Sequence, residues 1–337
     1  MRLLVVTQKV DLDDPILGFF HRWVEELAAH ADSVRVICLE EGRHALPENV
    51  VVSSLGKERG ASRLGYVAGF YRRVVPLLAA RRVDRVIVHM NEVYVLLLAP
   101  LLPLRRVRGI RLVWWKTHGQ LGRGSRIAWR FADAIATASE ESFPVVTRKK
   151  AVLGHGIDTS LFSDTPDASR GGRTLLVVGR LDPVKHVEDA LEALELLADA
   201  RLRVVGPPGD PGYVRRLSVG ADERVSFEPP RTYGRMPELY READVLVNTS
   251  DTDSVDKVVL EAMACGTVPV TSNRAFERML GPHGLFVPKR DPRALADAIR
   301  GVLELAPEER TRLAAELRSI VVDSHDLRRL ARALASL

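Results

Sequence analysis

The first half of the chain alternates short apolar runs with amphipathic segments. Apolar runs of strand length occur at 3–6, 34–40, 84–90, 110–118, 133–139 and 149–156. The segments 15–31 and 64–82 carry apolar residues at three- and four-residue spacing, which is typical of amphipathic helices. Strands that alternate with helices in this rhythm predict βαβ units and a parallel, doubly wound sheet.

A polar stretch rich in turn-forming residues, 163–173, interrupts the rhythm, which then starts again. The second half has expected strands at 174–180, 201–206, 224–229, 244–250 and 267–273, and expected helices at 186–200, 236–243, 256–265, 291–305 and 308–319. We therefore predict an α/β protein of two Rossmann-like, doubly wound domains that face each other across a cleft. The predicted parts are an N-terminal domain over 1–163, a linker over 164–172 and a C-terminal domain over 173–337, whose last helix can pack back on the N-terminal domain. Ligands of such folds bind beyond the carboxyl ends of the strands.

One apolar stretch, 93–104, has two interpretations. It is too short to span the hydrocarbon core of a bilayer, and prolines interrupt it. We favour a buried helix of the N-terminal domain. The alternative is a face that rests on a membrane, because the arginine-rich segment 105–111 follows and would meet anionic headgroups.

The totals describe a folded protein of two domains. A chain of 337 residues exceeds what one ordinary core serves, and its 46% apolar and 28% charged residues exclude a disordered protein. The two cysteines, Cys38 and Cys265, lie in apolar surroundings far apart in the sequence. This argues against a disulfide framework and favours the reducing cytoplasm. The apolar run at the start is too short for a signal peptide.

The net positive charge of the chain lies in its first half. Residues 1–165 carry 24 Lys and Arg against 17 Asp and Glu, whereas the remainder carries 25 against 27. A basic half suits nucleic acid, an anionic membrane face or an anionic substrate, or it is simply a solvated surface. No aromatic and basic platform or recognition motif accompanies it, so we expect no nucleic-acid partner.

Cations follow the first strand of the second half. Gly179 and Arg180 close that strand, and Lys185 follows at the start of a helix. Two cations at a strand end beside a helix N-terminus suit a diphosphate, although a pair of surface cations is the plainer alternative.

The segment 251–266, DTDSVDKVVLEAMACG, combines an acidic loop with an apolar helix. The N–H groups of the loop and of the first helical turn can hold phosphate or sugar oxygens. Glu261 lies among apolar residues, where an unpaired carboxylate costs several kcal/mol. Its partner is either a pair of ribose hydroxyls or an arginine of the same domain.

These motifs resemble the retaining GT-B-fold glycosyltransferases of the group 1 or family 4 type, which use nucleotide-sugar donors. The strand-end pattern VGR-x-x-x-x-K matches 178–185, and the E-x7-E pattern with its LEAMACG ending is similar to 253–266, which Pro269 and Val270 follow. The family's interdomain pattern NGVD-x-x-x-F is similar to HGIDTSLF at 155–162, and its closing segment is similar to 284–299. The resemblance covers roughly residues 150 to 300.

The resemblance implies roles for the donor-site residues. Arg180 and Lys185, next to Gly179, would hold the donor diphosphate, and Glu261 would bind the ribose. Asp253 would face the transferred sugar. The loop amides around Ser254 and Val255 would hold sugar or phosphate oxygens.

The chain departs from the family in this loop. Asp253 replaces the family's first Glu, so its carboxylate reaches about one methylene less far, and 254–257 (SVDK) stands where many members have a glycine-aromatic-glycine run. The DTD triplet also resembles the metal-binding D-x-D of the other glycosyltransferase fold. We expect no metal, because the arginine, the lysine and the helix dipole neutralise the diphosphate in GT-B enzymes.

The first half matches the family more weakly. The loop 8–18 takes the place of the family's glycine-rich loop, and the strand-end His-Gly makes His118 the candidate that touches the transferred sugar or the acceptor. A structural role is the alternative for each histidine and its neighbours. Further candidates for the acceptor side are Gly18, His21, Arg22, His89, Asn91 and Glu92.

We therefore expect a hexosyltransferase that moves a hexose from a nucleotide-diphosphate sugar, such as a UDP- or GDP-hexose, to an acceptor hydroxyl. Asp253 and His118 would orient the sugar, with retention and without a metal or other cofactor. A glycan or lipid-linked acceptor, in lipid-linked or cell-surface glycan synthesis, would place the protein in the cytoplasm or peripherally on the inner face of the cell membrane. The alternatives are a nucleotide-sugar epimerase or phosphorylase of the same fold, and a non-catalytic protein that binds nucleotide sugar or glycan.

Overall fold

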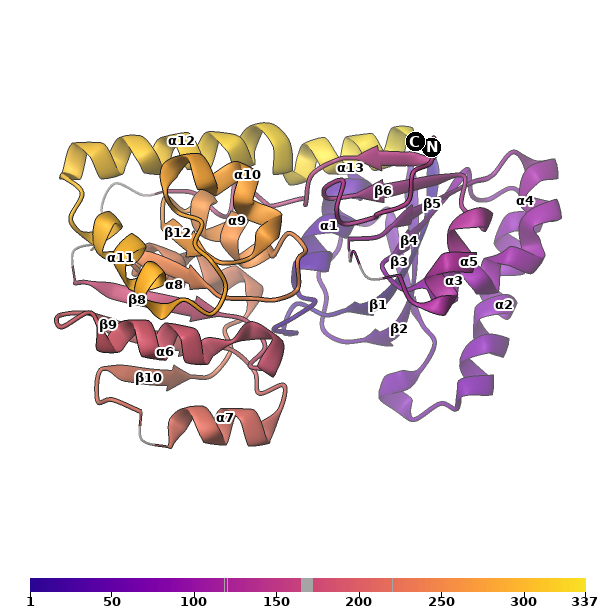
Figure 1. The fold of residues 1–337 in the computed structure, drawn as a ribbon. Helices are drawn as coiled ribbons and strands as arrows, with labels where there is room; N and C mark the ends of the chain where they lie inside the picture. Colours follow the sequence, from indigo (N-terminus) through magenta and orange to yellow (C-terminus); the bar gives the residue numbers. More distant parts are fainter. Residues whose placement is uncertain (118, 120, 165–171, 220) are drawn as a thin grey trace. The chain divides into compact units, whose positions relative to one another are not determined.

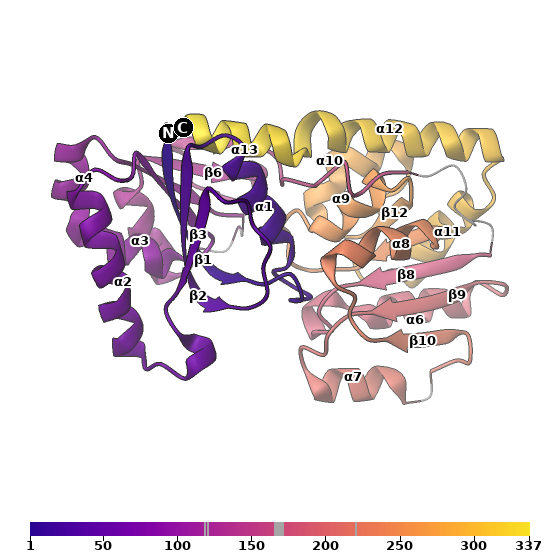
Figure 2. The same ribbon diagram turned by 180° about the vertical axis from the view of Figure 1, so that it is seen from behind.

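The chain forms two compact units, each built on its own parallel sheet. The computed structural model describes residues 1–117, 119, 121–164, 172–219 and 221–337. The first unit comprises Met1–Gly156 and Leu327–Leu337, and the second comprises Ile157–Asp326. Figure 1 and Figure 2 show the ribbon from opposite sides. The predicted α/β architecture with two Rossmann-like sheets is confirmed.

The sheet of the first unit has the strand order β3-β2-β1-β4-β5-β6-β7, and its described pairs are all parallel. Its strands are β1 (Arg2–Val10), β2 (Ser33–Glu41), β3 (Val50–Ser54), β4 (Arg85–His89), β5 (Arg111–Trp115), β6 (Ala134–Thr137) and β7 (Lys150–Val152). In the central strand β1, Leu3 is aligned with Val34 on one side and Arg85 on the other.

Helices cover both faces of this sheet. Successive residues of β1 point to opposite faces and are apolar on each, so both faces need to be buried. The helical segments are α1 (Phe19–Ala28), η1 (Lys57–Arg59), α2 (Arg63–Ala79), α3 (Glu92–Leu98), η2 (Ala99–Leu101), α4 (Leu102–Arg108), α5 (Arg123–Ala128), η3 (Trp129–Phe131) and α13 (Leu327–Ser336). Leu3 and Val5 pack in one buried layer with α1 and α13. Leu4 and Val6 pack in the other layer with residues of α2 and α3.

The apolar stretch 93–104 is a broken helix. Its residues Tyr94, Val95 and Leu98 are buried, as the favoured interpretation expects, whereas Val93 is exposed. Pro100 and Pro103 stand near the N-termini of η2 and α4, where a proline removes no helical hydrogen bond. In the described part of the chain, no helix is both long and apolar enough to cross a bilayer.

The second unit has a five-stranded parallel sheet of order β10-β9-β8-β11-β12. Its strands are β8 (Thr174–Val178), β9 (Arg201–Val205), β10 (Val225–Glu228), β11 (Val245–Asn248) and β12 (Val268–Thr271). Its helical segments are η4 (Pro183–Lys185), α6 (Val187–Glu195), α7 (Pro211–Ser218), η5 (Tyr233–Arg235), α8 (Met236–Arg241), α9 (Lys257–Ala264), η6 (Arg274–Phe276), α10 (Glu277–Leu280), η7 (Gly281–His283), α11 (Pro292–Leu303) and α12 (Pro307–His325). Helices α6 and α11 pack on one face, and α8, α9 and α12 on the other (Figure 2).

The strand order brings several loops to one edge of this sheet. Strand β8 pairs with β11, and β11 pairs with β12, so the segments that leave their carboxyl ends are neighbours. A further bridge between Thr271 and Phe286 continues the sheet beyond β12. The residues directly after Phe286 therefore arrive at the same edge.

The chain passes between the units at Gly156–Ile157 and at Asp326–Leu327. The sequence placed the boundary at 164–172, most of which lies outside the described residues. The structure assigns the preceding segment to the second unit because Ile157 and Phe162 are fully buried in its core. Leu327, at the other crossing, begins a helix that packs in the first unit.

Candidate functional site

The turn after β8 requires glycine. Gly179 has φ +142°, and its N–H donates to the carbonyl of Val205 at 3.1 Å. A Cβ on the neighbouring Gly206, at φ +157°, would lie 1.9 Å from the Gly179 carbonyl oxygen. Close approach of two backbones at strand ends is a typical reason for glycine. The turn after β8 thereby places Arg180 directly at the carboxyl edge of the sheet.

The two predicted diphosphate-binding cations, Arg180 and Lys185, leave the same loop. The Arg180 side chain is 60% exposed and lies 4.0 Å from Asp182. Lys185 is more buried, and its Nζ donates to Asp256 at 3.0 Å and to Ser250 at 3.3 Å. An exposed arginine beside a lysine that is held by two hydrogen bonds can neutralise an anion that approaches this edge.

In the acidic loop between β11 and α9, Asp253 is exposed, whereas the two residues that follow it are buried. Asp253 has φ +46°, a left-handed conformation that aspartate tolerates better than most residues, and its side chain is 54% exposed. Ser254 and Val255 are buried, and Val255 belongs to the hydrophobic core. The Ser254 carbonyl accepts a hydrogen bond from Asn273 Nδ2 at 3.0 Å. The predicted contacts of these two residues with a ligand would therefore come from their backbone.

Glu261 lies on α9 and is buried. Its Oε2 accepts a hydrogen bond from the hydroxyl of Tyr240 at 2.8 Å. Burial raises the pKa of Glu261, while the charge of Lys257 and the bond from Tyr240 act in the opposite direction. A lysine and a tyrosine thus take the place of the arginine considered from the sequence, and the ribose contact stays a prediction.

Lys257 is an unexpected cation in the first turn of α9. Its ammonium nitrogen is buried and lies 5.8 Å from the ring centroid of Tyr233. Burial lowers the pKa of Lys257 to about 8, although the Glu261 carboxylate acts to raise it. The four-residue spacing of Lys257 and Glu261 on one helix is a signal that the sequence already carried.

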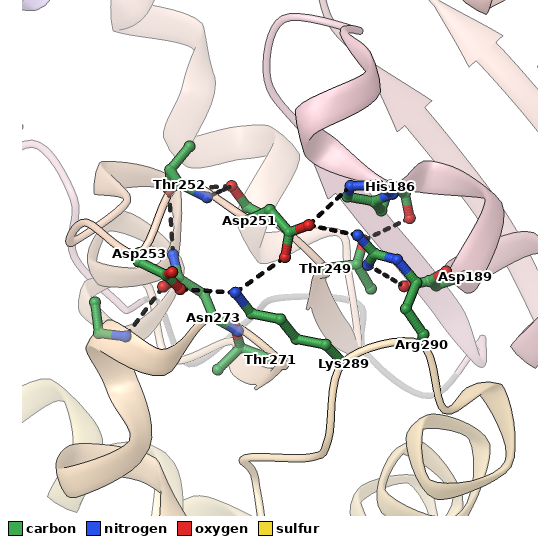
Figure 3. Close-up of polar contacts among 12 residues, drawn as sticks. His186, Asp189, Thr249, Asp251, Thr252, Asp253, Thr271, Asn273, Lys289 and Arg290 are labelled. Atoms are coloured by element: carbon green, nitrogen blue, oxygen red, sulfur yellow. Dashed lines mark hydrogen bonds and ion pairs between the residues drawn. The ribbon is translucent and has the colours of Figure 1, made fainter. Parts of the chain in front are cut away.

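A cluster of ion pairs surrounds Asp251 (Figure 3). Lys289 Nζ lies 3.0 Å from Asp251 and 2.7 Å from Asp253. Arg290 pairs with Asp251 and, at 3.0 Å, with Asp189 on α6. His186 Nε2 lies 3.0 Å from the same Asp251 carboxylate. The carboxylates of the DTD triplet are therefore engaged by cations of the chain itself.

The charges of this cluster shift the pKa of Asp251. Burial acts to raise the pKa of Asp251, but the hydrogen bond and charge of Lys289 and the charge of Arg290 lower it below the ordinary value. The sequence interpretation missed Lys289 and Arg290. The available signal was their position, two adjacent cations that follow the apolar segment 285–287 after a single proline.

A layer of polar side chains lies beneath the acidic loop. Thr271 donates to the backbone carbonyl of Asn248 at 2.9 Å, and Asn248 Nδ2 donates to Asp256 at 3.1 Å. Thr252 also donates to Asp256, at 3.2 Å. Asn273 Nδ2 lies 3.4 Å from the Thr252 hydroxyl (Figure 3). These bonds tie the loop to the ends of β11 and β12 and restrict its backbone.

Two acceptor-side candidates lie on α1 and differ in exposure. His21 is buried, and its Nε2 accepts the Ala45 N–H at 3.0 Å. Burial lowers the pKa of His21, so the ring is neutral at pH 7 and carries its proton on Nδ1, 3.4 Å from Glu25. Arg22 is 39% exposed and pairs with the same Glu25.

The other candidates of the first unit have clear local roles. A Cβ on Gly18 would lie 2.5 Å from the Asp14 carbonyl oxygen, so this turn into α1 requires a glycine. Asn91 caps α3 by accepting the Val93 N–H at 3.0 Å. Glu92 lies 4.0 Å from the buried ammonium of Lys116 at the end of β5. Their acceptor contacts stay predictions.

Two further histidines, His118 and His89, complete the set. His118 lies outside the described residues. His89, at the end of β4, is buried, with Nδ1 3.1 Å from the Thr7 hydroxyl and its ring stacked on Phe20 at 4.1 Å. This packing is that of a structural histidine.

Comparison with protein families places the strongest similarity in the second unit. Residues 172–305 match the model of the family described as Glycosyl transferases group 1. This range contains Arg180, Lys185 and the segment from Asp253 to Gly266. This match confirms the resemblance to group 1 glycosyltransferases for residues 172–305, and retention stays a prediction.

Two curated relatives are also named as glycosyltransferases. The chain is 33% identical over 219 residues to D-inositol 3-phosphate glycosyltransferase of Thermomonospora curvata, which is 54% of this chain and 51% of that protein. It is 34% identical over 184 residues to the protein of the same name from Geodermatophilus obscurus, which is 46% of this chain and 40% of that protein. The chain thus spans about half the length, or less, of these relatives.

Solved structures match over the whole chain. Anabaena Alr3699/HepE in complex with UDP-glucose aligns with a TM-score of 0.78 at 19% identity and covers 100% of this chain and 98% of that one. WaaG, a glycosyltransferase involved in lipopolysaccharide biosynthesis, aligns with a TM-score of 0.69 at 18% identity, covering 99% and 98%. The chain has the GT-B fold of these proteins.

Proposed function

We propose that the protein is a retaining hexosyltransferase that moves a hexose from a nucleoside-diphosphate sugar to an acceptor hydroxyl. The observation that carries the proposal is the carboxyl edge of the second sheet, where Arg180 and Lys185 leave one loop and Asp253 and Glu261 follow the neighbouring strand. This edge lies within the residues that match the group 1 glycosyltransferases. Because similar structures hold UDP or UDP-glucose, a UDP-hexose is the first donor to test.

The proposed sugar transfer requires positive charge beside the leaving diphosphate. When the bond between the anomeric carbon and the diphosphate breaks, the diphosphate oxygens gain negative charge. Arg180, Lys185 and the N–H groups at the start of α9 would stabilise this charge. We propose that no metal is needed, since Lys289 already engages the DTD carboxylates. Transfer that persists in excess EDTA would support this point.

Retention requires the acceptor hydroxyl to attack the face that the leaving group departs. In our proposal Asp253 orients the hexose, and its carboxylate stabilises an oxocarbenium-like transition state. His118 is kept from the sequence as the second sugar-binding residue. The anomeric configuration of the product, read by NMR, decides between retention and inversion.

The first unit is proposed to bind the acceptor. Residues 1–165, which include nearly all of this unit, carry 24 Lys and Arg against 17 Asp and Glu, whereas the remaining residues carry more acidic than basic side chains. The relatives are named for D-inositol 3-phosphate, a phosphorylated polyol. We propose an acceptor that carries phosphate, either free or within a lipid-linked glycan.

A membrane contact is proposed for α2 and α4. Leu64 on α2 and Val107 on α4 are each 82% exposed, and Arg63 and Arg106 are their exposed neighbours. Apolar side chains flanked by arginines favour the anionic inner face of a membrane. We expect the protein to sediment with phosphatidylglycerol vesicles at low salt and not with phosphatidylcholine vesicles. Leu64→Ser/Val107→Ser should weaken binding, and binding that ignores lipid charge would contradict the proposal.

The donor site is tested by thermal shift with UDP, GDP, ADP, CMP and TDP, each with and without Mg²⁺. A ligand at 100 times its Kd stabilises a protein by about 2.7 kcal/mol. We expect one nucleoside diphosphate to shift the wild type and not Arg180→Met. Arg235→Met is the matched control, because Arg235 is 70% exposed and pairs with Glu238 in the same unit.

Product analysis separates the remaining possibilities. Transfer of radiolabelled hexose to a phosphorylated acceptor supports the proposal. Conversion of the donor without an acceptor would indicate an epimerase instead. Tight nucleotide binding without turnover on any donor would indicate a non-catalytic binding protein, and no shift with any nucleotide would refute the donor site.

A further inference from the structure

A chain of ion pairs connects helix α6 to Asp253. Asp189 on α6 accepts a hydrogen bond from Arg290 Nη1 at 3.0 Å, and Arg290 also binds Asp251. Asp251 in turn lies 3.0 Å from Lys289 Nζ, which donates to Asp253 Oδ1 at 2.7 Å (Figure 3). Negative and positive side chains therefore alternate from helix α6 to the exposed loop.

The anchors of this chain are set by the fold. Asp189 is 5% exposed and lies in the first turn of α6. Arg290 has φ +58°, and the next residue, Asp291, caps α11 by accepting the Ala294 N–H at 2.9 Å. Lys289 lies three residues after Phe286, which forms a bridge with Thr271 at the end of β12. Its backbone is thus held between a sheet and a capped helix.

The side chain of Asp253, by contrast, has little support of its own. Its side chain is 54% exposed, and its backbone adopts the left-handed conformation. Within the described part of the chain, the bond recorded for its carboxylate is the one to Lys289. That bond uses Oδ1, and the side chain remains more than half exposed.

We infer that Lys289 is a positioning residue for Asp253, which it holds in the orientation that receives the transferred hexose. The inference rests on the proposed function and adds to it a residue from another loop. An aspartate on an exposed loop samples several rotamers, whereas a fixed ammonium at 2.7 Å selects one. Misplacement of an orienting group by 1 Å can cost about 100-fold in rate.

The kinetic test compares Lys289→Met, Lys289→Arg, Asp253→Asn and the double variant Asp253→Asn/Lys289→Met. In Lys289→Met we expect kcat to fall by about 100-fold with an unchanged donor KM, because the lost interaction orients the sugar and does not bind the nucleotide. Lys289→Arg should recover most of the rate. The double variant should be no slower than Asp253→Asn, since the lysine acts through that carboxylate.

The inference fails if Lys289→Met leaves kcat unchanged, changes only KM, or adds its full effect to that of Asp253→Asn. Arg235→Met, an exposed ion-pair variant in the same unit, is the control and should keep the wild-type kinetics. Equal unfolding midpoints of the variants exclude a global loss of structure.

A second measurement does not depend on activity. Hydrogen exchange of the amides in 250–256 should become about tenfold faster in Lys289→Met and stay unchanged in Arg235→Met. If the wild type transfers no sugar from any donor, the proposed function fails, and this measurement alone decides whether Lys289 holds the loop. Unchanged exchange would refute the positioning role.

Discussion

The side chains of Lys257 and Glu261 place opposite charges in the core of the second unit. Lys257 stands in the first turn of α9, where the helix dipole disfavours a cation, and its ammonium is buried. Glu261 is buried one turn later and also binds Tyr240. Two costly groups therefore stabilise each other, and removing either one leaves the other charge in a poor environment.

A double-mutant cycle tests this mutual dependence. We expect Lys257→Met to lower the free energy of unfolding at pH 7 by about 3 kcal/mol, because Glu261 loses its counter-charge. Lys257→Met/Glu261→Gln should recover most of that loss. Urea titrations of the four proteins measure the coupling, and strictly additive effects would show that the two side chains do not interact.

Among the helices, α12 has a titratable group buried at its C-terminal end. His325 ends this helix and is 6% exposed, and its carbonyl oxygen accepts the Ile157 N–H at 2.7 Å. Burial lowers the pKa of His325 from 6.5 to about 4. The folded state therefore binds fewer protons than the unfolded state between these two pH values.

The sign of the pH effect follows from this difference. Stability is lost as the pH falls through 6.5 towards 4, since the unfolded chain takes up the proton first. We expect the wild type to lose about 3 kcal/mol more than His325→Gln over this interval. Parallel curves of unfolding free energy against pH for the two proteins would contradict the prediction.

At the scale of the whole molecule, the C-terminal helix belongs to the unit formed by the beginning of the chain. Leu327, Leu330 and Leu334 of α13 are buried against α1 in the first unit. Arg85 of β4 donates to the carbonyls of Leu334 at 3.4 Å and Ser336 at 3.2 Å. The helix therefore covers part of the first core and has its final carbonyls satisfied by the same unit.

Truncation after Asp326 should destabilise the first unit selectively. Exposing three buried leucines costs about 1.5 to 3 kcal/mol each. We expect a lower unfolding temperature for that unit and binding of a hydrophobic dye, with the second unit still able to bind nucleotide. Arg332→Ala, an exposed position on the same helix, is the control. An unchanged first transition would show that α13 contributes no stability.

Much of the fold follows from local signals. The periodicity of apolar residues predicted most strands and the larger helices, because burial on both faces of a parallel sheet leaves near-continuous apolar runs. The strand β3 (Val50–Ser54) and the helix α7 (Pro211–Ser218) are among the elements that were missed. Both are short elements at or beside a sheet edge, where partial exposure leaves a weak pattern. The helix expected from residue 15 begins at Phe19, after the turn that Gly18 requires.

The sequence by itself determined the two parallel sheets, the glycine turn at Gly179 and the two cations that follow it, because each depends on residues close together along the chain. Only the tertiary structure decided the partners of the charged side chains. Lys289 and Asp253 are 36 residues apart, and Tyr240 and Glu261 are 21 apart. They meet because the strand order and the packing of helices bring separate segments together, and no local pattern encodes which of several nearby charges will be the neighbour.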